Sequence, residues 1–280
     1  MSDSASFSLK ISRTRRNALK MSGIAATAAL AALASSRPGM AGGGNGNGQG
    51  QNGNGQGQNG NGQGGGGKCM LKGTAVATAN GHRKVEELAI GDLMPTMYGG
   101  MRPIQWIGRS VIKKRNPAKP WPRSSQPIHI VASAIRPGTP HRDLYLSPEH
   151  ALLVEGVLVS AGSLVNDVTI QRFEASGYDE LEYFHVKVEG HDVIYAEGAP
   201  VETLLKADES FENFDEYVYL YGEPCEATPC APFVSCTGIR REFRSRARSA
   251  MAPWFDRRQP VDIIRDRLEE RALSQELEAA

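Results

Sequence analysis

Short apolar runs separated by turn residues dominate the hydrophobic and polar pattern between residue 69 and about residue 206. Residues 73–78 alternate small and β-branched side chains, as a strand does, and the Asn80-Gly81 pair that follows is a strong signal for a two-residue hairpin. Helical periodicity is nearly absent, so the pattern predicts an all-β domain. Further strands are expected at residues 103–108, 128–131, 144–146, 151–154, 157–159, 183–188 and 192–196.

The pattern changes beyond residue 207, and residues 208–280 are expected to form a C-terminal tail. Acidic and aromatic residues mix over residues 209–223, which we expect to lie across the β domain as an aromatic strap. A cysteine cluster follows among prolines. Pro260 then opens a predicted helix, because proline is favoured in the first helical turn. Four apolar residues share one face of this helix: Val261, Ile264, Leu268 and Ala272.

Residues 1–41 have the features of an export signal. The pair Arg15-Arg16 is followed by Lys20 and by a weakly apolar, alanine-rich stretch that ends at Ala34. This arrangement resembles a twin-arginine signal, with cleavage expected after Ala34 or Ala41. A chance arginine pair ahead of an alanine helix is the alternative. The signal interpretation predicts an exported protein, periplasmic or extracellular, whose first partner is the twin-arginine export machinery.

Residues 42–68 are expected to form a disordered linker, since residues 42–67 contain only Gly, Asn and Gln and have nothing to bury. The chain as a whole carries 32 basic and 31 acidic residues, but residues 69–280 carry 25 basic and 30 acidic ones. A mildly acidic folded part argues against a nucleic-acid binder that relies on a basic face. No apolar run after residue 41 is long enough to span a bilayer, so no stable membrane span is expected after signal removal.

An ordered block with a recognisable spacing begins at Cys69. It reads Cys-x3-Gly-Thr-x-Val-x-Thr-x2-Gly-x3-Val-Glu-Glu-Leu-x2-Gly-Asp and ends at Asp92. The block resembles the opening of the Hint family, the self-processing domain shared by Hedgehog proteins and inteins. The resemblance implies an all-β horseshoe with pseudo-two-fold halves over residues 69–207. It also implies that the Cys69 thiol attacks the carbonyl of Lys68 and converts the peptide bond into a thioester by an N-to-S acyl shift.

A second block, Leu146-Ser-Pro-Glu-His150, resembles the Thr-x-x-His motif of the same family, with Ser147 in place of threonine. The resemblance implies that His150 protonates the departing amine of Cys69 and that the Ser147 hydroxyl contacts the same peptide. Histidine suits this task because its ordinary pKa lies near neutrality. A single histidine after a strand, taken without the motif, is more often structural.

Residues 183–198 resemble the closing pattern of the family. His185 stands at an acid/base position where inteins commonly carry aspartate, and His191 matches a conserved histidine, although it could equally be a turn residue. Inteins end on a His-Asn pair whose asparagine cyclises. Glu202 and Thr203 occupy the matching positions, so splicing is not expected, whereas cleavage at the cysteine alone, as in Hedgehog proteins, remains open.

The predicted function is therefore single-turnover autoproteolysis at the Lys68-Cys69 bond, without a cofactor. The acyl acceptor is water or another small nucleophile. The competing hypothesis is an exported, non-catalytic Hint-like scaffold or interaction module in which Cys69 is inert or disulfide-bonded.

Two further alternatives receive less support from the residues. Zinc binding is disfavoured because no histidine pair has ligand spacing and the tail cysteines lack a Cys-x-x-Cys. In an exported protein, two of Cys225, Cys230 and Cys236 are instead expected to form a disulfide. A cysteine protease built on Cys69 and His150 would need a substrate cleft that the sequence does not specify.

Overall fold

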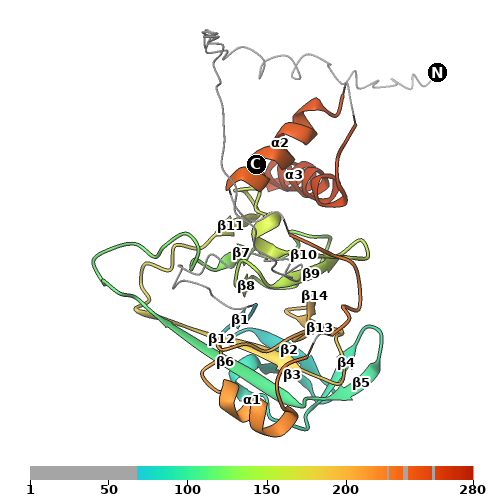
Figure 1. Ribbon diagram of the computed structural model, residues 1–280. Helices are drawn as coiled ribbons and strands as arrows, with labels where there is room; N and C mark the ends of the chain where they lie inside the picture. Colours follow the sequence, from blue (N-terminus) through green and yellow to red (C-terminus); the bar gives the residue numbers. More distant parts are fainter. Residues whose placement is uncertain (1–67, 226, 236–238, 254–255, 280) are drawn as a thin grey trace, which may run out of the picture. The chain divides into compact units, whose positions relative to one another are not determined.

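The computed structural model describes residues 68–225, 227–235, 239–253 and 256–279 (Figure 1). The predicted export signal, the predicted linker apart from Lys68, and Cys236 lie outside the described residues. Among the helices of the described segments, none is long and apolar enough to cross a membrane.

Two larger sheets and a two-stranded ribbon form the β domain (Figure 1). The first sheet has the strand order β11 (Ile170–Arg172), β7 (Ile128–Ile130), β8 (Leu144–Leu146), β1 (Met70–Leu71), β12 (Glu180–Lys187) and β6 (Trp106–Lys113). The second has the order β15 (Phe233–Val234), β10 (Val157–Ser160), β9 (Ala151–Val154), β14 (Ala199–Glu202), β13 (Val193–Ala196), β2 (Ala75–Thr78) and β3 (Gly81–Lys84). The ribbon pairs β4 (Leu93–Thr96) with β5 (Gly100–Pro103).

This architecture confirms the all-β prediction. The expected hairpin joins β2 to β3, with Thr78 opposite Gly81. Gly81 adopts a φ of 97°, a conformation that glycine reaches without steric cost. Short single-turn 3₁₀ helices follow β3 at Val85–Glu87 and β10 at Ala161–Ser163. The apolar pattern thus predicted strands such as β7 and β8, which have one buried face.

The main core cluster combines apolar side chains from both larger sheets. Met70 and Leu146 come from the first sheet, while Leu152 and Val201 come from the second, and all four are fully buried. A second cluster surrounds Trp106 on β6 and includes Cys69. The chain therefore passes from one cluster to the other between Cys69 and Met70, which puts Cys69 deep inside the protein.

The segment expected to be an aromatic strap contains a short helix, α1 (Phe214–Tyr221). Two of its aromatic side chains meet Trp106 edge to face: the ring centroids lie 5.4 Å away for Phe211 and 5.2 Å away for Tyr217. Such edge-to-face contacts are favourable beyond the apolar area that they bury. Phe211 also lies 6.4 Å from the ring of His185, so this segment packs against the same cluster as Cys69.

The predicted C-terminal helix is confirmed as α3 (Pro260–Ala279). Its predicted apolar face is buried, and three of the four residues join the main core cluster: Val261, Ile264 and Leu268. Arg271 on the same helix donates a 2.9 Å hydrogen bond to the backbone oxygen of Ser133. The helix is therefore packed against the β domain as well as against its neighbour in sequence.

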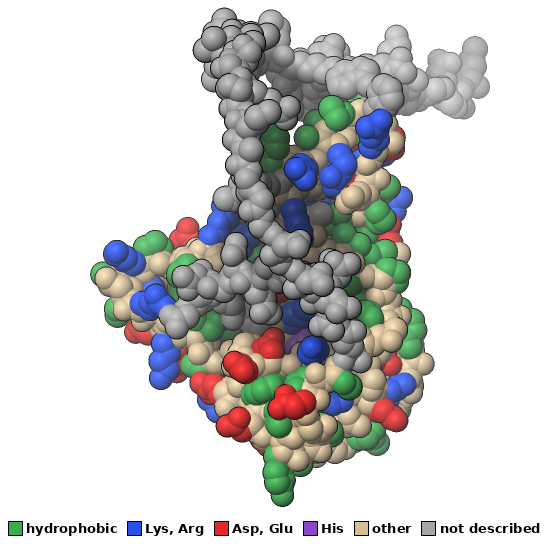
Figure 2. Space-filling view, viewed as in Figure 1, with side chains coloured by type: hydrophobic (Ala, Val, Ile, Leu, Met, Phe, Trp, Pro, Cys, Tyr) green, Lys and Arg blue, Asp and Glu red, His purple; other side chains and the backbone are tan. Residues whose placement is uncertain are grey.

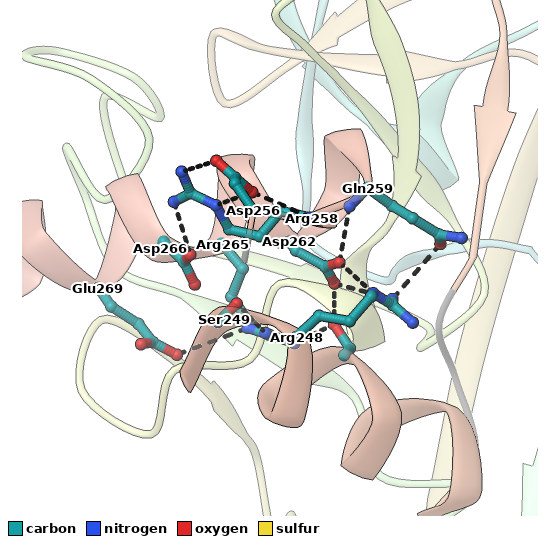
Figure 3. A network of polar contacts seen from close by, with 10 residues as sticks. Arg248, Ser249, Asp256, Arg258, Gln259, Asp262, Arg265, Asp266 and Glu269 are labelled. Carbon is teal, nitrogen blue, oxygen red and sulfur yellow. Dashed lines mark hydrogen bonds and ion pairs between the residues drawn. The ribbon is translucent and has the colours of Figure 1, made fainter. Parts of the chain in front are cut away.

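A second tail helix, α2 (Ile239–Met251), was not anticipated by the sequence reasoning. Arg241, Arg244 and Arg246 on this helix are exposed, and Figure 2 shows Lys and Arg side chains where α2 lies in Figure 1. A polar network holds α2 against α3 (Figure 3). Asp262 is buried at its centre, where it accepts a hydrogen bond from the Ser245 hydroxyl and one of 2.6 Å from Arg248 Nε.

Among the described residues, the expected tail disulfide is not formed, and Cys236 lies outside them. Cys225 and Cys230 both have free thiols. Any pairing among the three tail cysteines would engage at least one of these two, so the prediction of a disulfide in this cluster is wrong for this structure.

Candidate active site

Cys69 enters the first sheet through the strand that lies between β8 and β12. Met70 on β1 pairs with Leu146 on β8 and with Phe184 on β12. Extending these two antiparallel registers by one residue puts Cys69 opposite Ser147 on one side and His185 on the other. The sheet therefore brings together three residues that are far apart in sequence.

Reciprocal hydrogen bonds hold the peptide of Cys69 against Ser147. The Cys69 backbone N–H donates a 2.7 Å hydrogen bond to the Ser147 hydroxyl, and the Ser147 backbone N–H donates one of 2.9 Å to the Cys69 carbonyl. Both residues are fully buried. The nitrogen of the Lys68-Cys69 peptide bond is thus fixed in orientation by the side chain that the sequence motif singled out.

His150 follows Ser147 in a tight turn, in which its backbone N–H donates a 3.1 Å hydrogen bond to the Ser147 carbonyl. Its ring is fully buried, and neither ring nitrogen has a hydrogen-bond partner of normal geometry. Burial lowers the pKa of His150 to about 4, while the charge of Glu202 and the backbone of Lys68 act in the opposite direction. The ring is therefore neutral at pH 7 and lies beside the backbone of Lys68.

His185 is the second buried histidine of the site. Its ring centroid lies 4.8 Å from that of His150, and neither of its nitrogens has a hydrogen-bond partner of normal geometry, although the ring lies beside the backbone of Glu202. Burial lowers its pKa well below the usual value, and the proximity of His150 and Lys68 lowers it further. Two adjacent buried imidazoles with unused nitrogens are unusual, because buried polar groups are normally hydrogen-bonded and the exceptions tend to lie at functional sites.

His191 lies in the turn before β13 and makes two polar contacts. The Cys230 backbone N–H donates a 3.0 Å hydrogen bond to its Nδ1. Because Nδ1 accepts, the neutral ring carries its proton on Nε2, which lies 3.3 Å from a carboxylate oxygen of Glu202. The structure thus gives His191 the contacts of a residue that orients Glu202.

Glu202 ends β14 with a carboxylate that is almost completely buried. Its other oxygen accepts a 2.9 Å hydrogen bond from the Ala151 backbone N–H and lies 3.9 Å from Lys68 Nζ. Burial alone would raise its pKa, but the hydrogen bond from His191 and the nearby positive charge of Lys68 outweigh that effect and lower it. Glu202 is therefore ionised.

The surroundings of the Cys69 thiol disfavour its ionisation to a thiolate. Burial raises its pKa well above the usual range, and the negative charges of Asp208 and Glu202 raise it further. Cys69 therefore rests as a neutral thiol, and the sheet register puts it opposite the neutral His185. Such a pair can transfer a proton only as a bond to sulfur forms.

The sequence reasoning missed two contributors to this site. Glu202 was noted only as a replacement for the histidine of inteins, although a carboxylate that ends an apolar strand is itself a signal of a buried polar role. Phe233 on β15 had no such signal; its ring centroid lies 4.5 Å from Lys68 Nζ. Among the described residues, no group of three or more His, Cys, Asp or Glu side chains is arranged to hold a metal ion.

Comparison with solved structures finds several inteins of similar fold. The crystal structure of the gp41-1 intein is 16% identical and covers 48% of this chain and 98% of its own, with a TM-score of 0.34. The MchDnaB-1 intein is 14% identical, covers 47% and 98%, and has a TM-score of 0.33. The solution structure of a bacterial intein-like domain from Clostridium thermocellum is 11% identical, covers 49% and 99%, and has a TM-score of 0.28. No curated protein matches the chain.

The sequence profile described as "Hint domain" matches residues 68–208, which is just over half of the 280 residues. The match begins immediately before Cys69 and contains both buried histidines and the Glu202-His191 contact. The predicted resemblance is thereby confirmed at the level of the family. The chain belongs to the Hint domain family.

Proposed function

We propose that the protein cleaves its own Lys68-Cys69 peptide bond through a thioester on Cys69. The observation that carries this proposal is the set of groups around that one bond. The Ser147 hydroxyl holds its nitrogen, the unbonded ring of His150 lies beside the Lys68 backbone, and His185 lies next to His150. A buried constellation of this kind serves no evident packing purpose, since it leaves four ring nitrogens without partners.

The acyl shift forms a bond from Cys69 Sγ to the Lys68 carbonyl carbon and breaks the bond from that carbon to the Cys69 nitrogen. The thiol proton must end on the departing α-amine, which is a poor leaving group until it is protonated. The pKa of about 4 makes His150 neutral at the start, so it acts first as a base toward the thiol and then as an acid toward the amine. This differs from the expectation of a histidine that titrates near neutrality, and the cause is burial.

The second step releases the acyl group. Water adds to the thioester carbonyl, the carbon–sulfur bond breaks, and the products are a Lys68 carboxylate and a free Cys69 thiol with a new N-terminal amine. Another small nucleophile could take the place of water. Thr203, which stands where inteins carry the cyclising asparagine, instead accepts a 2.9 Å hydrogen bond from the Asp192 backbone N–H, so the reaction proposed here ends at Cys69 without splicing.

The competing function is a non-catalytic scaffold, and one observation favours it. Cys69 is fully buried and its raised pKa keeps the thiol protonated, which is the environment of an inert cysteine. In this case the buried histidines would be remnants without a reaction to serve. We also propose that either form is exported through the twin-arginine signal predicted in residues 1–41.

Intact-mass measurement of the purified protein separates the two functions. The wild type should give a fragment that begins at Cys69 and no fragment that ends at Glu202 or Thr203. Dithiothreitol or hydroxylamine should accelerate its release, because both attack a thioester. A wild type that stays intact with either reagent would leave only the scaffold.

Three variants test the roles of the two principal residues. Cys69→Ala should abolish cleavage, whereas His150→Ala should slow it by ~10² to 10⁴, the usual contribution of general acid–base catalysis. The double variant should be no slower than Cys69→Ala, since groups that act in one step are not additive. Unchanged cleavage in His150→Ala would remove His150 from the mechanism.

A further inference from the structure

We propose that Glu202 and Phe233 together form a binding site for the Lys68 side chain, so that the cleavage reaction is selective for a basic residue immediately before Cys69. We call these two residues the Lys68 seat. The inference rests on the proposed cleavage, and it adds that the C-terminal tail takes part in recognising the bond to be cut.

The contacts of Lys68 carry the argument. Its Nζ lies 3.9 Å from a Glu202 carboxylate oxygen and 4.5 Å from the centroid of the Phe233 ring. The Glu202 side chain is 1% exposed, while that of Lys68 is 37% exposed. The ammonium group of Lys68 therefore contacts both a buried carboxylate and an aromatic ring, and both contacts are favourable for a cation.

The carboxylate is well prepared to receive a cation. Glu202 is held by the Ala151 backbone N–H and by His191, and the two side chains of the His191-Glu202 pair are each only 1% exposed. An ionised carboxylate that is removed from water is costly unless positive charge or hydrogen bonds compensate it. Lys68 is the nearby side chain that supplies a full positive charge, and it thereby completes the environment of Glu202.

The tail supplies the aromatic part of the seat from outside the segment that the family profile matches. Phe233 pairs in parallel with Leu158 on β10, and the Leu158 backbone N–H donates a 2.8 Å hydrogen bond to the Pro232 carbonyl. Three residues earlier, the Cys230 backbone N–H binds the ring of His191. The tail is thus attached at two points close to the residues that contact Lys68, once to the sheet and once to the histidine that orients Glu202.

The consequence is a preference that the sequence motif alone does not contain. Seating the side chain also positions the Lys68 carbonyl, since backbone and side chain belong to the same residue, and positioning of a reacting group is a recognised source of rate. The seat is partly open to solvent, so the preference should be moderate. We expect about a 3- to 10-fold slower cleavage when the charge is removed, in line with a half-exposed ion pair and one cation–π contact.

Amine labelling tests the seat without relying on cleavage. In the uncleavable Cys69→Ala protein, acylation of Lys68 by N-hydroxysuccinimidyl acetate, followed by peptide mass spectrometry, should be several-fold slower than that of Lys113, which is 77% exposed. Glu202→Gln and the milder Phe233→Leu should each accelerate the labelling of Lys68 by about 2- to 5-fold. Labelling of Lys72, which pairs with Glu182, should not change and so reports on folding.

The matched aromatic control is Tyr219→Leu, since the side chain of Tyr219 on α1 is 88% exposed. It should leave the labelling of Lys68 unchanged. Lys68 that is labelled as fast as Lys113, or that responds to neither Glu202→Gln nor Phe233→Leu, would overturn the seat whether or not the protein cleaves itself.

Cleavage rates then test the predicted selectivity for a basic residue at position 68. Lys68→Arg should cleave close to the wild-type rate, Lys68→Met should be about 3- to 10-fold slower, and Lys72→Met should be unaffected. Wild-type cleavage with an equally fast Lys68→Met would refute the selectivity and leave the proposed function intact. An uncleaved wild type with a protected Lys68 would refute the proposed function and leave the binding site intact.

Discussion

The neutral state of buried His150 makes the stability of this protein sensitive to acid, and a single substitution should remove a defined part of that sensitivity. In the unfolded chain a histidine titrates near its ordinary pKa of 6.5, whereas burial lowers the pKa of His150 to about 4 in the folded state. Above pH 6.5 the ring is neutral in both states and contributes nothing. Below pH 6.5 the unfolded chain binds a proton that the folded protein does not, so stability falls as the pH falls.

The magnitude follows from the difference between the two pKa values. That difference is about 2.5, and each pKa unit corresponds to about 1.4 kcal/mol. The free energy of unfolding should therefore decrease by about 3 kcal/mol between pH 6.5 and pH 4 on account of His150 alone. This is a large share of the total stability of a typical domain.

The assay is urea unfolding of Cys69→Ala protein at pH 7 and at pH 4, compared with the same protein carrying His150→Gln. Glutamine does not titrate, so the variant should lose about 3 kcal/mol less on acidification than its parent. His185 and the carboxylates are present in both proteins, so their contributions largely cancel. His82→Gln is the matched control, because His82 is exposed on β3, and it should leave the acid sensitivity unchanged.

Equal acid sensitivity in the parent and in His150→Gln would refute the reasoning, because it would mean that His150 titrates alike in the folded and unfolded states. The cleavage rate offers a second readout. It should be nearly independent of pH above about pH 5 and should fall as the pH approaches 4, since only the neutral ring can accept the thiol proton.

Three other predictions concern separate parts of the chain. Ser147→Ala should lower the free energy of unfolding by about 1–3 kcal/mol and slow cleavage, because the buried Cys69 N–H loses its acceptor. Ser147→Thr should retain both stability and cleavage rate. Urea unfolding measures the stability, and mass spectrometry measures the cleavage. Asp262→Ala should lower the free energy of unfolding by a similar ~1–3 kcal/mol through loss of the network between α2 and α3, and an unchanged urea midpoint would contradict that role. Replacing Arg15 and Arg16 by lysine should retain the protein in the cytoplasm, as fractionation would reveal, and normal export of the double variant would exclude a twin-arginine signal.

Local pattern was enough to predict most of the strands and the helix at Pro260. Strands such as β7 and β8 alternate between buried and less buried positions, and the turn at Gly81 needs a backbone conformation that glycine favours. The apolar face of α3 likewise repeats at the helical period. The helix α2 was not predicted because its sequence is rich in arginine. Its contact with Asp262 on α3 helps to stabilise it, and the sequence of α2 alone does not contain that contact.

In the candidate site, the sequence identified the residues, and the structure was needed for their electrostatic state. The resemblance to the Hint family singled out Cys69, Ser147, His150, His185 and His191, because these residues stand at the matching positions of its motifs. Their electrostatic state could not be predicted, since burial sets it. A histidine that is solvated near neutrality in a peptide has a pKa of about 4 when the core surrounds it.

The sequence by itself therefore determined the position of most strands and the residue types that flank the Lys68-Cys69 bond. Only the tertiary structure decided that Glu202 and Phe233 meet Lys68, because these residues are separated by long stretches of chain and are joined through the pairing of β14 with β9 and of β15 with β10. The physical reason is that strand propensity and turn chemistry act over a few residues, whereas burial and charge pairing depend on the contacts between distant segments that the sheets create.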